Sequence, residues 1–159
     1  VLDKVGPGQA FAETYACVPN EPMLVNVAAA ENCTVLFLKT AQILSPCAVN
    51  CRHHGKLIEN LLLVSAQKNL SLSRRIFHTA PKTIRGRLIS YLSFQAIREN
   101  SDSFTIPFNR QQLADYLGVE RSGLSVELGK MRDEGLLDFH KSHFLLKTPE
   151  ADRPFPSAR

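Results

Sequence analysis

The chain has 159 residues, of which 44% are hydrophobic, and a formal net charge of +4, as expected for a globular protein of one or two domains. No apolar run approaches the roughly 20 residues needed to span a bilayer, and no basic segment followed by an apolar one marks a signal peptide. These observations argue against a membrane or secreted protein. Together with four cysteines, they predict reduced thiols and a cytoplasmic location.

The N-terminal segment 1–44 has the pattern of β-strands, with candidate strands at 24–29 and 33–38. Val25, Val27 and Ala29 alternate with their neighbours in the period-2 manner of a half-buried strand. About four strands are too few for a closed barrel, so the segment is interpreted as the C-terminal half of a β-barrel domain. Because the chain begins at Val1 in a strand-like pattern, we expect that an N-terminal portion is missing or was removed.

Residues 45–80 are predicted to form a long helix. It begins at Ser45-Pro46, where serine can cap and proline fits the first turn, weakens at Gly55 and continues to about Thr79. Its apolar residues spread around much of the circumference, which requires burial on several sides. One side can pack on the β-domain and another on a second copy of the chain, giving a symmetric homodimer. The alternative is a core helix of a monomer.

The remaining residues are predicted to form a C-terminal domain over 81–147 and a mobile tail over 148–159, which is rich in proline and lacks a periodic pattern. Pro81 is predicted to end the long helix and to act as a hinge. An amphipathic helix is expected over 83–97, followed by a short edge strand over 104–108 that tolerates a proline.

Two short helices joined at Gly118 follow the edge strand. Asn109 can cap the first helix, and Gly118 can end it with a positive φ. Arg121, Ser122 and Ser125 lie near the exposed N-terminal end of the second helix. The buried faces are predicted to contain Leu113, Ala114, Leu117, Val119, Leu124, Leu128 and Met131.

This pattern is typical of a helix-turn-helix, which presents the start of its second helix to the DNA major groove, but any three-helix core can produce it. Residues 135–146 follow as a two-stranded hairpin with a polar tip, so strand, two helices and hairpin together predict a winged helix. The charge agrees: residues 1–73 carry five basic and five acidic side chains, and residues 74–159 carry fourteen and ten. Phosphate binding needs such local positive potential, although a solvated surface could also produce it.

The order of these parts resembles the CRP/FNR family of bacterial transcription regulators, most specifically over 8–13, 83–92 and 109–137. The resemblance implies an α+β fold with a partial, jelly-roll-like sensor barrel related to cyclic-nucleotide-binding domains, a long dimerisation helix and a C-terminal winged helix. It further implies a sequence-specific DNA-binding regulator rather than an enzyme, acting as a homodimer on a palindromic site. The implied partners are double-stranded DNA, a second copy of the chain and RNA polymerase.

The resemblance also implies contacts with DNA, each of which has a solvated surface side chain as its alternative. Arg121 matches an arginine that reads a guanine edge, where guanidinium can donate twice. The implied base contacts are Arg121, Ser122 and Ser125, and the implied phosphate contacts are Arg110, Gln111, His140 and Lys141. Two positions depart from the family: Val126 stands where arginine is common, and Gly123 where alanine or threonine is usual. Both departures predict weaker DNA binding or an altered preferred sequence.

The effector is not identified by the sequence. Cyclic-nucleotide-binding relatives hold phosphate with a Gly-Glu pair and an Arg-Ser pair, and this chain has Ala12-Glu13 and Met23-Leu24 instead. Because an apolar pair cannot neutralise a buried phosphate, cyclic AMP is not expected, and no cofactor is predicted. A small molecule or a redox change stays open as the signal.

Cysteine chemistry is the alternative sensing mechanism. Cys47 and Cys51 can share one helical face with His54, and thiolate and imidazole ligands suit zinc, iron–sulfur or haem sites. The spacing is not a Cys-x-x-Cys knuckle, and cysteine is among the most often buried residue types. Structural thiols are therefore the favoured interpretation, and no metal site is predicted.

Two other classes of function have sequence features that bear on them. A dimerisation or partner-binding module with weakened DNA binding is favoured by Val126 and Gly123. An enzyme is disfavoured because the chain has no GxSxG, P-loop, HExxH or paired-carboxylate arrangement.

Overall fold

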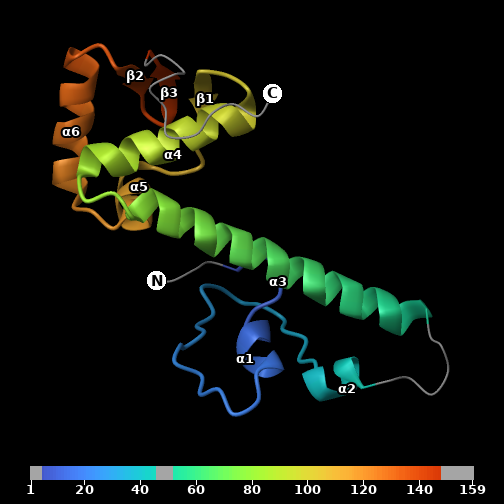
Figure 1. Ribbon diagram of the computed structural model, residues 1–159. Helices are drawn as coiled ribbons and strands as arrows, with labels where there is room; N and C mark the ends of the chain where they lie inside the picture. Colours follow the sequence, from blue (N-terminus) through green and yellow to red (C-terminus); the bar gives the residue numbers. More distant parts are fainter. Residues whose placement is uncertain (1–4, 46–51, 148–159) are drawn as a thin grey trace. The chain divides into compact units, whose positions relative to one another are not determined.

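The computed structural model describes residues 5–45 and 52–147. It divides into two compact units, Val1–Leu70 and Ser71–Arg159. The boundary lies inside helix α3 (Arg52–Thr79), which is continuous over 28 residues (Figure 1). No described helix is long and apolar enough to cross a membrane. The predicted tail over 148–159 lies outside the described residues.

The described residues of the first unit form two short helices, α1 (Glu13–Cys17) and α2 (Thr40–Leu44), and the first part of α3. Residues 18–39 join α1 to α2 without a regular element. The Lys68 ammonium ties α1 to α3, because it lies 2.7 Å from the Glu13 carboxylate and donates to the Ala10 carbonyl at 2.8 Å. Thr40 Oγ1 donates to the Ala16 carbonyl at 2.7 Å and so joins α2 to α1.

The prediction of strands over 24–29 and 33–38 is wrong, since residues 5–45 contain no strand. A period-2 pattern marks one apolar face, but a strand also needs a neighbour to accept and donate its backbone hydrogen bonds. Leu24, Leu36 and Phe37 are 78%, 81% and 87% exposed, so no described segment covers these side chains. The described part of the N-terminal segment therefore does not show the expected half-barrel.

Two features predicted for the long helix also differ. Ser45 follows α2 as its C-terminal boundary residue, so a helix ends there rather than begins, while Pro46 lies outside the described residues. The helix also passes through Gly55 without a break. Glycine in an exposed helix costs only about 1 kcal/mol relative to alanine, which the surrounding residues of a long helix can offset.

Up to residue 147, the second unit contains the end of α3, three further helices and a small sheet. Helix α4 (Ile84–Glu99) begins at Thr83, whose side chain accepts from the Gly86 amide, and ends at Asn100 in the left-handed region. The sheet is antiparallel in the order β1-β3-β2, formed by β1 (Ser103–Thr105), β2 (Leu137–His140) and β3 (His143–Leu146). β1 is thus an edge strand, as predicted, but it ends at Thr105, so Pro107 of the predicted strand 104–108 lies outside it.

One hydrophobic core holds α4, α5 (Arg110–Leu117), α6 (Arg121–Asp133) and the sheet together. Fully buried residues come from each layer: Leu88, Leu92, Leu113, Leu117, Leu124, Leu128, Leu137 and Phe144. Phe104 and Phe144 pair across β1 and β3 in register. The predicted winged-helix arrangement of strand, two helices and hairpin is confirmed.

Candidate nucleic-acid interface

The helix-turn-helix is built by two local signals, both predicted from the sequence. Asn109 and Gln112 form a capping box at the start of α5, in which each side chain accepts from the other's backbone amide. At its end, Gly118 has φ 63° and ψ 45°, and its amide donates to the carbonyls of Ala114 and Asp115. This left-handed residue is why the chain turns sharply into α6.

Helix α6 has one buried and one exposed face. Leu124, Leu128 and Met131 are buried, and Val119 packs partly against the same core. The opposite face of its N-terminal half exposes Arg121, Ser122, Ser125 and Val126. The three predicted base contacts therefore lie together at the end of α6 that a helix-turn-helix presents to base edges.

Two of these exposed positions have features that bear on the predicted contacts with DNA. The Ser125 hydroxyl donates to the Arg121 carbonyl at 3.0 Å, which keeps its oxygen available as an acceptor at the helix surface. Val126 is 59% exposed. Since nothing in the unit requires valine there, a longer polar side chain would fit at this surface.

The predicted phosphate contacts differ in whether their side chains are already bonded within the protein. The Gln111 amide donates to Asp115 Oδ1 at 2.9 Å and lies along its own helix. His140 and Lys141 are exposed at the tip of the β2–β3 hairpin, where Lys141 has a positive φ of 53°. The hairpin tip thus offers an exposed imidazole and an exposed ammonium to an anionic partner.

Arg110 is engaged with the hairpin. Its guanidinium carbon lies 5.0 Å from the Phe139 ring centre and 5.7 Å from that of Phe144, within the range of cation–π attraction. Nη2 also donates to the Lys141 carbonyl at 3.4 Å. Burial lowers the pKa of this guanidinium from its ordinary value. Arg110 therefore joins the start of α5 to the β2–β3 hairpin, the wing of the winged helix, in addition to any contact with phosphate.

A further arginine, Arg85, has a role that the sequence does not reveal. Arg85 of α4 forms a paired contact with Glu134 at 2.7 Å for each nitrogen and also binds Glu127 at 2.6 Å. These hydrogen bonds raise the pKa of Arg85 and lower that of Glu134. These bonds hold α4 against α6 at the surface of the unit. No local motif marks these residues, because 42 and 49 positions separate the partners.

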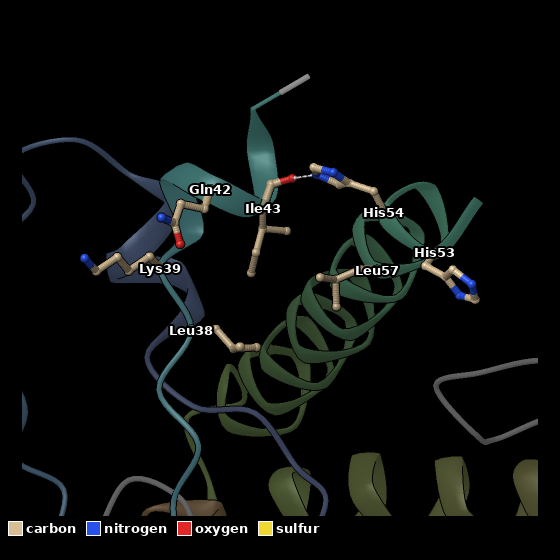
Figure 2. Close-up of a pocket in the computed structure, with 7 residues that line it drawn as sticks. All are labelled: Leu38, Lys39, Gln42, Ile43, His53, His54 and Leu57. Carbon is tan, nitrogen blue, oxygen red and sulfur yellow. Dashed lines mark hydrogen bonds between the residues drawn. The ribbon is translucent and has the colours of Figure 1, made fainter. Parts of the chain in front are cut away.

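The first unit contains a shallow pocket of about 310 Å³ between α2 and the start of α3. It is lined by Leu38, Lys39, Gln42, Ile43, His53, His54 and Leu57. Figure 2 shows His54 directed at Ile43, whose carbonyl accepts from Nε2, while His53 points away from it. The lining combines apolar side chains with a lysine, an amide and two imidazoles.

The positions related to cyclic-nucleotide and metal binding are only partly described. Glu13 is buried and paired with Lys68, while Met23 and Leu24 are exposed. Cys47 and Cys51 lie outside the described residues, so their grouping with His54 stays a prediction. Within residues 5–45 and 52–147, no three His, Cys, Asp or Glu side chains gather as metal ligands do.

Residues 86–151 match the model of the Crp-like helix-turn-helix domain. A comparison with curated proteins gives no match. The matched range contains α5, α6 and the hairpin, so the domain match and the observed winged helix agree. Together they support a Crp-like DNA-binding domain in this part of the chain and suggest a DNA-binding transcription regulator.

Proposed function

We propose that the protein is a sequence-specific regulator that binds a palindromic DNA site as a homodimer. The observation that carries this proposal is the exposed N-terminal end of α6, where Arg121, Ser122 and Ser125 lie opposite the buried face. Arg121 reads a guanine through its guanidinium. The two serines contact neighbouring bases, and the wing tip residues His140 and Lys141 contact phosphate.

The test begins with selection of bound sequences from a random DNA pool, with and without reductant, followed by titration of the selected duplex. Arg121→Ala should cost about 1–3 kcal/mol in binding and relax the preference at one base pair. Lys130→Ala is the matched control, because this exposed cation of α6 is roughly two and a half turns further along and faces the other way. Equal losses for both variants, or no preference for any duplex, would count against the proposal.

Dimerisation is supported by apolar side chains that α3 leaves exposed. They are Leu62, Leu63, Leu70, Leu72, Ile76 and Phe77. Leu63, Leu70 and Phe77 recur every seven residues and so follow one stripe of the helix. Such a surface in contact with water favours a partner, and a second copy of the same helix supplies an equivalent stripe.

Adjacent substitutions separate the dimer from a monomer. Leu70→Glu places a charge in the stripe, whereas Ser71→Glu places the same charge about 100° further around the helix, outside the stripe. Sedimentation equilibrium should show weakened association for Leu70→Glu alone, with lost affinity for the palindrome and retained affinity for a half-site. Association unchanged by Leu70→Glu would argue for a monomer.

The proposal includes an effector other than cyclic AMP, received by the N-terminal unit. It is supported by the exposed apolar pair Met23-Leu24, which cannot neutralise a phosphate, and by the pairing of Glu13 with Lys68. Addition of cyclic AMP should leave the affinity for the selected duplex unchanged. Metal analysis of anaerobically purified protein tests the redox alternative, in which Cys47, Cys51 and His54 bind a metal.

A further inference from the structure

Two arginines bind the end of α5, where the chain turns into α6, the recognition helix of the proposed DNA contact. Arg75 of α3 donates from Nε to the Tyr116 carbonyl and from Nη2 to the Asp115 carbonyl, both at 3.3 Å. Arg87 of α4 donates from Nη1 to the carbonyls of Leu117 and Gly118 at 2.9 and 3.0 Å. Four successive carbonyls thus accept from two guanidiniums.

The chemistry of a helix end explains why arginine serves here. The last carbonyls of a helix lack amide donors of their own helix, and they carry the negative end of its dipole. A guanidinium has several donors in a fixed plane, so one arginine can bind two adjacent carbonyls. The Arg75 guanidinium carbon also lies 5.7 Å from the Tyr116 ring centre, which adds a second contact to the same helix end.

The connection between α3 and α4 is held by the same group of residues. Arg87 Nε donates to the Pro81 carbonyl at 2.8 Å. Gly86 brings α4 close to the proline ring, since a Cβ at this position would lie 2.9 Å from Pro81 Cβ. His78, near the end of α3, is buried, lies 3.1 Å from the Ser90 hydroxyl and contacts the ring of Tyr91 edge-on. Pro81 is therefore packed against Gly86 and bonded to Arg87, while His78 fixes the end of α3 to α4.

We propose that Arg75 and Arg87 are positioning residues that fasten the turn of the helix-turn-helix to the last turns of α3. The recognition helix α6 then follows the last turns of α3, residues 71–79, as one body, and the segment around Pro81 does not act as a free hinge. The unit boundary agrees, because residues 71–79 belong to the same compact unit as the winged helix. In a dimer, the separation of two recognition helices would be set by α3 itself, a consequence that rests on the proposed function.

The test measures the distance between nitroxides on Leu72 of α3 and Val126 of α6, two exposed positions of the second unit. The labels are attached to p-acetylphenylalanine in the full chain, so the cysteines remain, and labelled protein is diluted with unlabelled protein. The wild type should give a narrow distance distribution that Arg75→Gln and Arg87→Gln broaden. Arg74→Gln removes the neighbouring guanidinium, which lies over Phe94 of α4 rather than on the α5 carbonyls, so it should broaden the distribution less than either substitution.

Arg75→Lys keeps the charge and one donor toward the helix end, so it should restore part of the narrow distribution if Arg75→Gln fails to fold. A broad distribution in the wild type, or one that Arg75→Gln and Arg87→Gln leave unchanged in folded protein, would overturn the proposal. On the selected duplex, Arg75→Gln should lower affinity without changing the salt slope, whereas loss of a phosphate contact lowers that slope by about 1. A reduced slope would assign Arg75 to DNA. If the wild type selects no duplex, the proposed function fails and the distance measurement still decides the role of the arginines.

Discussion

Replacing the two glycines of the recognition helix should have unequal effects on stability. Both Gly123 and Gly129 lie inside α6, where alanine is favoured over glycine by about 0.8–1.0 kcal/mol because it restricts the unfolded backbone. A methyl group at Gly129 would meet no atom within 4 Å. Gly129→Ala should therefore raise the free energy of unfolding by this full amount.

Gly123 is different because α4 lies against it. An added Cβ would be 3.0 Å from Ile84 Cδ1, closer than the roughly 3.5–4.0 Å of a favourable carbon–carbon contact. The Ile84 side chain must move to admit the methyl group, which offsets part of the gain. We expect Gly123→Ala to add less than about 0.5 kcal/mol, compared with about 0.8–1.0 kcal/mol for an unhindered site.

Shortening the Ile84 side chain isolates its contact with the added methyl group at position 123. Ile84→Val removes Cδ1 and costs about 0.5–1.5 kcal/mol by itself. In that background, Gly123→Ala should regain the full helix preference of about 0.8–1.0 kcal/mol, so the two substitutions are coupled. Gly129→Ala should give the same gain with isoleucine or valine at position 84.

Urea unfolding followed by near-UV circular dichroism measures these changes, because the rings of Tyr91 and Tyr116 pack in the core of the second unit. Equal stabilisation by Gly123→Ala and Gly129→Ala in both backgrounds would refute this prediction, since the contact with Ile84 would then have no energetic cost. A destabilising Gly129→Ala would equally contradict the open space at that position.

Three further outcomes are expected. Asn109→Ala should lower the free energy of unfolding by about 0.5–2 kcal/mol, because it removes the α5 cap, while Asn109→Asp keeps the acceptor and should cost less in the same urea titration. Val126→Arg should raise the affinity for the selected palindrome and steepen its salt dependence by about 0.9 for each added phosphate contact; a titration showing unchanged or lower affinity would contradict this. Burial, and secondarily the Arg74 charge, lowers the pKa of His78 from its ordinary 6.5, so the unfolded chain binds the proton more readily. The contribution of His78 to the free energy of unfolding should accordingly be complete above about pH 6.5 and fall as the pH drops below it. His78→Gln should remove this pH dependence, and a wild-type stability that does not change with pH would disprove the prediction.

The helix-turn-helix could be predicted because its signals are local. Asn109 caps the helix that follows it, and Gly118 supplies the positive φ at the turn. Each of these residues acts on backbone groups a few positions away, so the sequence alone contains both partners. The apolar spacing that predicted burial of Leu113, Leu117 and Leu124 is likewise a property of single helices.

The N-terminal strands could not be predicted in the same way, because a strand depends on distant partners. The alternation over 24–29 specifies which side chains share a face, but pairing must come from another segment. The roles of Arg75 and Arg87 are hidden for a related reason. Their carbonyl acceptors lie 30 to 41 positions further along the chain, and any surface arginine has the same local pattern.

These internal contacts change what the positive charge of the C-terminal half implies for DNA binding. The excess of basic residues over 74–159 favoured a phosphate-binding surface, yet Arg75, Arg85 and Arg87 bind carbonyls and carboxylates within the unit. Arg110 lies over two rings of the wing. Since each phosphate contact contributes about 0.9 to the log–log salt slope, a protomer that relies mainly on Lys141 and His140 should bind with a shallow salt dependence. Selectivity would then depend on base reading by α6 more than on attraction to phosphate.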